Sequence, residues 1–185
     1  PLELYWQNFT KAWKNGHFGQ GFLNSLRLAA ITALIVLTAS SLAGYVLGMK
    51  KFRGQKLVHV YFLMAMTVPV QLFLFPLYGA LAKLGLIGSV YAVCFIIAAV
   101  NMPLAVMLMR TFFMKVPVQI EEAARLDGAS TFQLLTRIVI PMVRPGMITV
   151  AVLIILNAWN EYLISSTFLQ GEENFTVTLG YLTLN

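Results

Sequence analysis

Long runs without a formal charge constrain the fold of this chain more than any other feature. Residues 28–49 contain no Asp, Glu, Lys or Arg over 22 positions, and residues 57–82 and 84–109 contain none over 26 positions each. A helix of 22 residues is about 33 Å long at about 1.5 Å per residue, which is enough to cross a hydrocarbon core of about 30 Å. Strands of membrane barrels alternate in polarity over about ten residues. The runs lack that alternation, so they predict membrane-spanning helices.

The composition also indicates a lipid environment. Hydrophobic residues make up 59% of the 185 residues and charged residues 11%, whereas soluble domains contain roughly 45–50% and about 25%. We expect an all-α polytopic membrane protein with a single domain over residues 1–185 and spans at about residues 22–49, 57–82, 84–110 and 145–170. The chain begins at Pro1 and shows no signal-peptide pattern, so we expect a piece of a longer protein.

The basic residues predict the orientation of the spans. Two loops, after the first and third spans, lie on one side and contain nine of the 13 Lys and Arg residues: Lys50, Lys51, Arg53, Lys56, Arg110, Lys115, Arg125, Arg137 and Arg144. Loops rich in Lys and Arg stay in the cytoplasm. The polar segment at about residues 116–144, between the third and fourth spans, is therefore expected on the cytoplasmic side.

This polar segment contains signals for two short helices. Pro117 suits the first position of a helix, because its missing N–H would have no partner there. Glu121 and Glu122 then lie near the positive end of the helix dipole. Gly128 is expected to end this helix in a left-handed conformation.

The second helix is predicted to start at once. Ser130 and Gln133 form a capping-box pattern. An apolar stripe at helical spacing follows, made of Phe132, Leu135, Ile138 and Val139. Pro141 and Pro145 are expected to stop this helix and turn the chain back towards the membrane.

Two interpretations of the polar segment are open: an amphipathic pair of helices resting on lipid headgroups, or a surface that docks a soluble protein. Helices of the first kind usually have many basic residues on their polar face. This segment instead has three acids, Glu121, Glu122 and Asp127. The acids favour protein docking.

The segment resembles the loop with the pattern E-A-A, three residues, G, nine residues, I-x-L-P of permease subunits of bacterial ABC importers. Here Glu122-Ala123-Ala124 precedes Gly128, and Ile138-Val139-Ile140-Pro141 follows, with Ile140 where the family usually has Leu. Leu126-Asp127-Gly128-Ala129 and Trp159-Asn160-Glu161-Tyr162-Leu163 resemble the carbohydrate-uptake branch, of the maltose and glycerol-phosphate type.

The resemblance implies a type I ABC importer permease fold with six spans, of which this chain lacks the first and last. It implies a multi-pass subunit in the bacterial cytoplasmic (inner) membrane that forms half of the pathway for a sugar or sugar-like solute. The expected partners are a cytoplasmic ATPase subunit dimer, a second permease subunit, an extracytoplasmic solute-binding protein and the lipid bilayer, with no nucleic acid.

In such permeases the loop is a coupling helix-turn-helix that sits in a groove of the ATPase. The resemblance assigns ATPase coupling to Glu121, Glu122, Ala123, Ala124, Asp127, Gly128, Ile138 and Pro141. No cofactor or metal is expected on the chain, since ATP is bound and hydrolysed by the partner ATPase. In agreement, the sequence has no Gly-rich phosphate loop ending in Lys-Ser or Lys-Thr. The chain is therefore not expected to be an enzyme.

Glu161 is an acid inside the fourth predicted span, where a charge costs roughly 2.5–3.5 kcal/mol by insertion scales. Two interpretations are open. Glu161 either lines the solute pathway together with Trp159, Asn160 and Tyr162, or it pairs with a basic group on a neighbouring helix. An alternative function, a secondary transporter driven by an ion gradient, would use Glu161 but has no need of the coupling loop.

Overall fold

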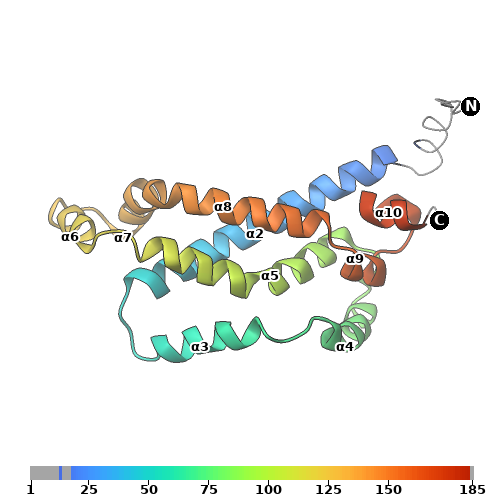
Figure 1. Ribbon diagram of the computed structural model, residues 1–185, viewed down its shortest axis with the longest axis horizontal. Coiled ribbons are helices and arrows are strands. Elements are labelled where there is room, and N and C mark those ends of the chain that lie inside the picture. Colours follow the sequence, from blue (N-terminus) through green and yellow to red (C-terminus); the bar gives the residue numbers. More distant parts are fainter. Residues whose placement is uncertain (1–12, 14–17, 184–185) are drawn as a thin grey trace, which may run out of the picture. The chain divides into compact units, whose positions relative to one another are not determined.

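The computed structural model describes Trp13 and residues 18–183, and every regular element within them is helical (Figure 1). The all-α prediction is confirmed. The elements are α2 (Phe18–Met49), α3 (Gln55–Ala65), α4 (Gln71–Lys83), α5 (Val90–Phe113), α6 (Val118–Leu126), α7 (Thr131–Gln133), the π-helix η1 (Leu134–Val139), α8 (Ile140–Trp159), α9 (Leu163–Phe168), the 3₁₀-helix η2 (Glu172–Asn174) and α10 (Val177–Thr183).

Among the described residues, three helices are long and apolar enough to cross a membrane: Phe18–Met49, Val90–Phe113 and Thr131–Trp159. The first two match charge-free runs of the sequence. The helix α5 starts six residues later than the run 84–110, because the chain first turns through Gly85 and Gly88, whose φ angles are 66° and 85°. These left-handed conformations suit glycine and end a helix.

The run 57–82, expected as one span, contains two helices. α3 ends at Ala65 and α4 begins at Gln71, with a turn and a bend between them. Pro69 accounts for the break, because it has no N–H to donate and it disfavours helical backbone at the preceding residue, Val68.

The chain forms two compact units, and α2, α5 and α8 each contribute residues to both. The first unit contains the described residues of Pro1–Thr32, Pro69–Ile97 and Ile155–Asn185. Its core includes Leu28, Val93, Cys94, Ile97, Ile164 and Phe168. Within this unit α4 contacts α9 (Figure 1).

The second unit contains Ala33–Val68 and Ala98–Ile154. Its core includes Val36, Met109, Phe113, Leu134, Val139 and Ile154. These residues come from α2, α5, η1 and α8, so the polar segment after α5 is anchored in the same core as the apolar helices.

Two glycines of α2 set how closely that helix approaches α5 in the second unit. A Cβ atom at Gly44 would lie 2.7 Å from Cβ of Met109, and one at Gly48 would lie 2.9 Å from the carbonyl oxygen of Arg110. Such distances are shorter than side chains tolerate. Small residues at helix contacts let two backbones come close, which is a main source of helix association in lipid.

We expect Gly44→Ala to destabilise the protein by about 1–3 kcal/mol, since the added methyl group must push α5 away. The control is Gly79→Ala in α4, where a Cβ meets nothing within 4 Å and alanine improves helix propensity. Thermal unfolding of both purified variants in detergent measures the difference. Equal unfolding temperatures would contradict the close approach of α2 and α5.

Candidate functional site

The first helix of the polar segment, α6, lies between an extended proline and a left-handed glycine. Pro117 has φ −62° and ψ 133°, so it is the N-cap that precedes the helix. The sequence had instead predicted it as the first residue of the helix. Gly128 has φ 84°. The N–H groups of Gly128 and Ala129 donate to the carbonyls of Arg125 and Ala124 at 3.1 and 2.9 Å. This is a Schellman motif, and it confirms that Gly128 ends the helix.

The second helix starts with the predicted capping box. The N–H of Gln133 donates to Oγ of Ser130 at 3.3 Å, and the N–H of Ser130 donates to Oε1 of Gln133 at 2.9 Å. Both bonds satisfy N–H groups that a helix start leaves unpaired.

The prediction that Pro141 and Pro145 stop this helix is wrong. The helix continues from Thr131 to Trp159, and Pro145 lies inside α8. The six residues before α8, Leu134–Val139, form a π-helix, in which N–H groups bond five residues back. The hydrogen bonds are thus shifted by one residue just before Pro141, which has no N–H to donate. The helix continues through Pro141.

The π-helix also changes which side chains face the core. Leu134 and Val139, five residues apart, are fully buried, whereas Phe132 is 75% exposed. Phe132, the first residue of the apolar stripe noted in the sequence, therefore does not share the burial of Leu134 and Val139.

The residues assigned to ATPase coupling fall on two sides of this segment. Glu121 and Ala124 are buried on the inner face of α6. The outer face of α6 includes Glu122, Ala123 and Leu126, of which Leu126 is 89% exposed, and the C-cap residue Asp127 is exposed beside them. Gly128 and Pro141 are also exposed, and Ile138 is half-buried. The sequence interpretation did not identify Leu126 and Phe132 as exposed apolar residues of this surface. For Leu126 a signal was present, because it is a large apolar residue among the charged residues of a short helix.

Glu121 has two cationic partners. Its carboxylate binds the Lys50 ammonium, which follows α2, and accepts a bond of 3.0 Å from Nε of Arg125. Burial alone would raise the pKa of Glu121, but the bonds from Lys50 and Arg125 outweigh burial and hold this pKa below its usual value. A carboxyl group with a lowered pKa adds stability above its ordinary pKa and loses it as the pH falls through the lowered value. Glu121 is therefore ionised at neutral pH.

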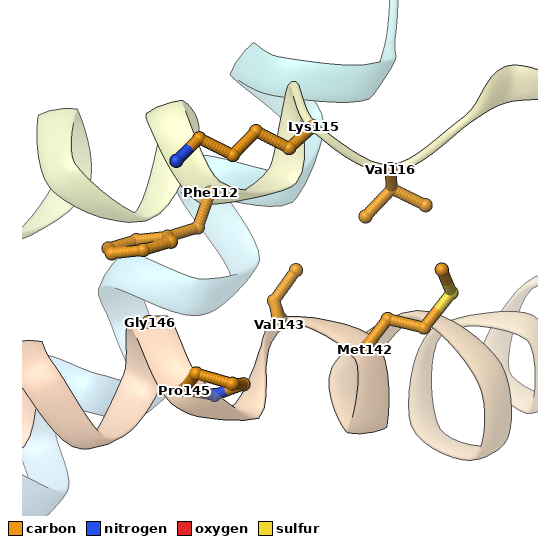
Figure 2. A pocket seen from close by; sticks show the side chains of 7 residues that line it. All are labelled: Phe112, Lys115, Val116, Met142, Val143, Pro145 and Gly146. Carbon is orange, nitrogen blue, oxygen red and sulfur yellow. The ribbon is translucent and has the colours of Figure 1, made fainter.

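Beside this segment, a cavity of about 190 Å³ lies between the end of α5 and the start of α8 (Figure 2). Figure 2 shows the Phe112 ring directed from α5 towards α8, where Val143 and Gly146 lie, with the Lys115 side chain running alongside Phe112. A Cβ atom at position 146 would overlap the Phe112 ring. Glycine at this position therefore allows the ring to pack directly on α8.

The residues suggested for the solute pathway lie together in the first unit, where α8 ends. The Glu161 carboxylate accepts bonds from the N–H groups of Ile164 and Ser165 at 2.8 and 2.9 Å and from Oγ of Ser165 at 3.2 Å. Glu161 thus caps the start of α9, where the helix dipole stabilises a negative charge. The Asn160 side chain, just past the end of α8, donates to the Leu156 carbonyl of that helix.

The two aromatic residues of this group differ in environment. The Trp159 ring packs edge-on against Phe22 with the ring centroids 5.5 Å apart, and its carbonyl accepts a bond from Thr178. The Tyr162 side chain is 43% exposed.

Comparison with known proteins identifies the family. Residues 40–185 match the family described as binding-protein-dependent transport system inner membrane component, and the chain belongs to this family. It is a transport component of the inner membrane, and the role of its family is transport and not catalysis. The family match and the relatives give no support to the alternative of an ion-gradient-driven transporter.

Relatives in the family include sugar permeases. The diacetylchitobiose uptake system permease NgcG of Streptomyces coelicolor is 29% identical over 180 residues, covering 97% of this chain and 60% of NgcG. The arabinooligosaccharides transport system permease AraQ of Bacillus subtilis is 31% identical over 185 residues, covering 100% of this chain and 65% of AraQ. The chain therefore spans less than two thirds of the length of these relatives.

A solved structure shows the same fold. The crystal structure of a bacterial ABC transporter involved in the import of the acidic polysaccharide alginate matches with a TM-score of 0.76 and 24% identity, covering 94% of this chain and 62% of the matched chain. The expected ABC importer permease fold is confirmed.

We expect Glu161→Ala to lower the stability of the protein by about 0.5–2 kcal/mol, because α9 loses the acceptor for its first N–H groups. Asn160→Ala is the matched control, since the Asn160 side chain donates to a carbonyl of the preceding helix α8 and not to α9. Thermal unfolding in detergent compares the two. A Glu161 variant as stable as the Asn160 variant would exclude the capping role.

Proposed function

We propose that this chain is part of the permease subunit of an ATP-driven importer for a sugar or sugar-like solute. Its polar segment, α6 with the turn at Gly128 and the start of the following helix, docks onto a cytoplasmic ATPase subunit. The observation that most supports docking is the exposure of Leu126 and Phe132, at 89% and 75%. Large apolar side chains grouped with charges on an exposed surface are typical of interfaces covered by another protein.

The outer face of α6 supplies the contacts. Glu122 makes a charged contact with the ATPase, while Ala123 beside it permits a close approach of the two surfaces. Gly128 provides the turn, and Ile138 and Pro141 belong to the helix that leads from this surface into α8. The basic residues of the two loops support a cytoplasmic position for this segment.

The geometry of α6 suits the transfer of motion. Ala124 packs into the core of the second unit, and Glu121 is ion-paired on the same inner face. A displacement of α6 by a closing ATPase dimer therefore moves the second unit with it. Such rigid-body movement is a common basis of conformational switching, and here it would switch the pathway formed with the second permease subunit between inward-facing and outward-facing.

The substrate class is supported by the relatives and by the residues near α9. NgcG and AraQ carry names that refer to diacetylchitobiose and arabinooligosaccharides. Tyr162 and Trp159 offer aromatic faces that stack on sugar rings, and Asn160 and Glu161 lie between them in sequence. We assign these four residues to the solute pathway, and we assign delivery of the solute to an extracytoplasmic binding protein.

ATP dependence tests the proposal. In proteoliposomes containing the full transporter, uptake of radiolabelled di- and oligosaccharides is expected to stop when the ATPase subunit is inactivated by mutation of its phosphate loop. Dissipating the ion gradients with ionophores is expected to leave uptake unchanged. Uptake that survives the ATPase mutation but stops with ionophores would overturn the proposal.

Replacing Gly128 by valine is expected to abolish uptake and weaken co-purification with the ATPase, with membrane insertion unchanged. A left-handed conformation costs a residue other than glycine about 1–2 kcal/mol, and the turn between α6 and α7 requires it. Gly54→Val is the matched control, since Gly54 has φ 89° and, like Gly128, open space around a Cβ atom. Unchanged uptake in the Gly128 variant, or an equal loss in the Gly54 variant, would argue against this role.

A further inference from the structure

The neighbouring acids Glu121 and Glu122 have opposite environments. Glu122 is exposed on the outer face of α6, whereas Glu121 retains 9% of its exposure and points into the second unit. Consecutive residues of a helix are rotated by about 100°, and here one carboxylate is exposed while the other is buried beside the core. Glu121 therefore needs a role of its own.

The partner of Glu121 lies far away in the sequence. Lys50 is 71 residues earlier and directly follows the last residue of α2. Arg125, one turn along α6, binds the same carboxylate oxygen and holds the Glu121 side chain in place. The side chains of Lys50 and Glu121 are 30% and 11% exposed, so water screens the pair less than it screens a surface ion pair.

Lys50 is itself positioned by the contact between α2 and α5. Its ammonium lies 5.1 Å from the centroid of the Tyr45 ring, and that ring packs edge-on against Phe113 of α5 at 5.8 Å. Burial alone would lower the pKa of Lys50, but its contacts with Glu121 and Tyr45 outweigh burial and raise this pKa. The ammonium is therefore charged at any physiological pH, and its position is fixed by both α2 and α5.

The covalent connections of α6 lead to α5, through residues 114–117, and to α8, through the turn at Gly128. No short covalent path leads from α6 to α2, because Lys50 and Glu121 are 71 positions apart. The Lys50–Glu121 pair supplies a direct polar connection between these two elements.

We propose that Lys50 and Glu121, oriented by Arg125, are positioning residues that transfer the displacement of α6 to α2. This inference rests on the proposed function. The two acids then have different roles: Glu122 contacts the ATPase, and Glu121 connects α6 to the long apolar helix α2. Loss of the pair would leave docking intact while motion reaches α2 less effectively.

A charge exchange tests the proposal in the reconstituted full transporter. Lys50→Glu and Glu121→Lys, made singly, are each expected to reduce uptake about tenfold, which is a typical size for a coupling between two sites. Co-purification with the ATPase should stay unchanged, and more ATP should be hydrolysed per solute transported. The double variant restores the pair with opposite polarity and is expected to recover most of the uptake.

Two controls separate this role from general effects of charge or folding. Lys51→Glu makes the same change of charge at an exposed neighbour and is expected to keep normal uptake, and Lys50→Arg keeps the ion pair and should do the same. A double variant no better than the single ones, or a Lys51 variant as impaired as the Lys50 variant, would overturn the proposal. If uptake still depends on the ATPase in either case, the proposed function remains supported although this inference is overturned.

Discussion

A carboxylate beside an apolar core costs free energy unless cations and hydrogen bonds accompany it. Glu121 meets this condition with Lys50 and Arg125, and the arrangement of α6 depends on it. With Glu121 turned inward, the helical repeat turns Ala124 towards the core and leaves Glu122, Ala123 and Leu126 on the outside. The face that we propose for docking is thus determined by an ion pair on the opposite side of the same helix.

The ion pair depends in turn on the apolar part of the second unit. Lys50 has a defined position because α2 and α5 approach each other at Gly44 and Gly48 and because Tyr45 packs on Phe113. Lipid provides no hydrophobic driving force between helices, so close packing of this kind must hold them together. Gly44 and Gly48, which have no side chain, thereby help to position the charge of Lys50 just beyond the apolar run.

The sequence predicted the features that depend on neighbouring residues. Charge-free runs indicated α2 and α5, and the turn at Gly128 and the capping box at Ser130 involve residues only a few positions apart. The pairing of Lys50 with Glu121 could not be predicted in this way, because a contact across 71 positions leaves no local pattern. For Glu161 the sequence leaves a basic partner open, whereas its partners among the described residues include backbone N–H groups of the next helix, which every sequence contains.

Proline gave the least reliable prediction, since its effect depends on the hydrogen bonds around it. Pro69 coincides with a break between helices, whereas Pro141 follows a π-helix and the helix continues through it without a break. The π-helix has a further consequence for how α6 is aimed. It accommodates one residue more than α-helical turns do over nearly the same rotation, so deleting one residue of Leu134–Val139 would let regular α-helix form and leave the direction of the preceding chain almost unchanged. The π-helix therefore holds an extra residue while the proposed docking helix keeps its direction, whereas deleting a residue from the regular turns of α8 would rotate the preceding chain by about 100°.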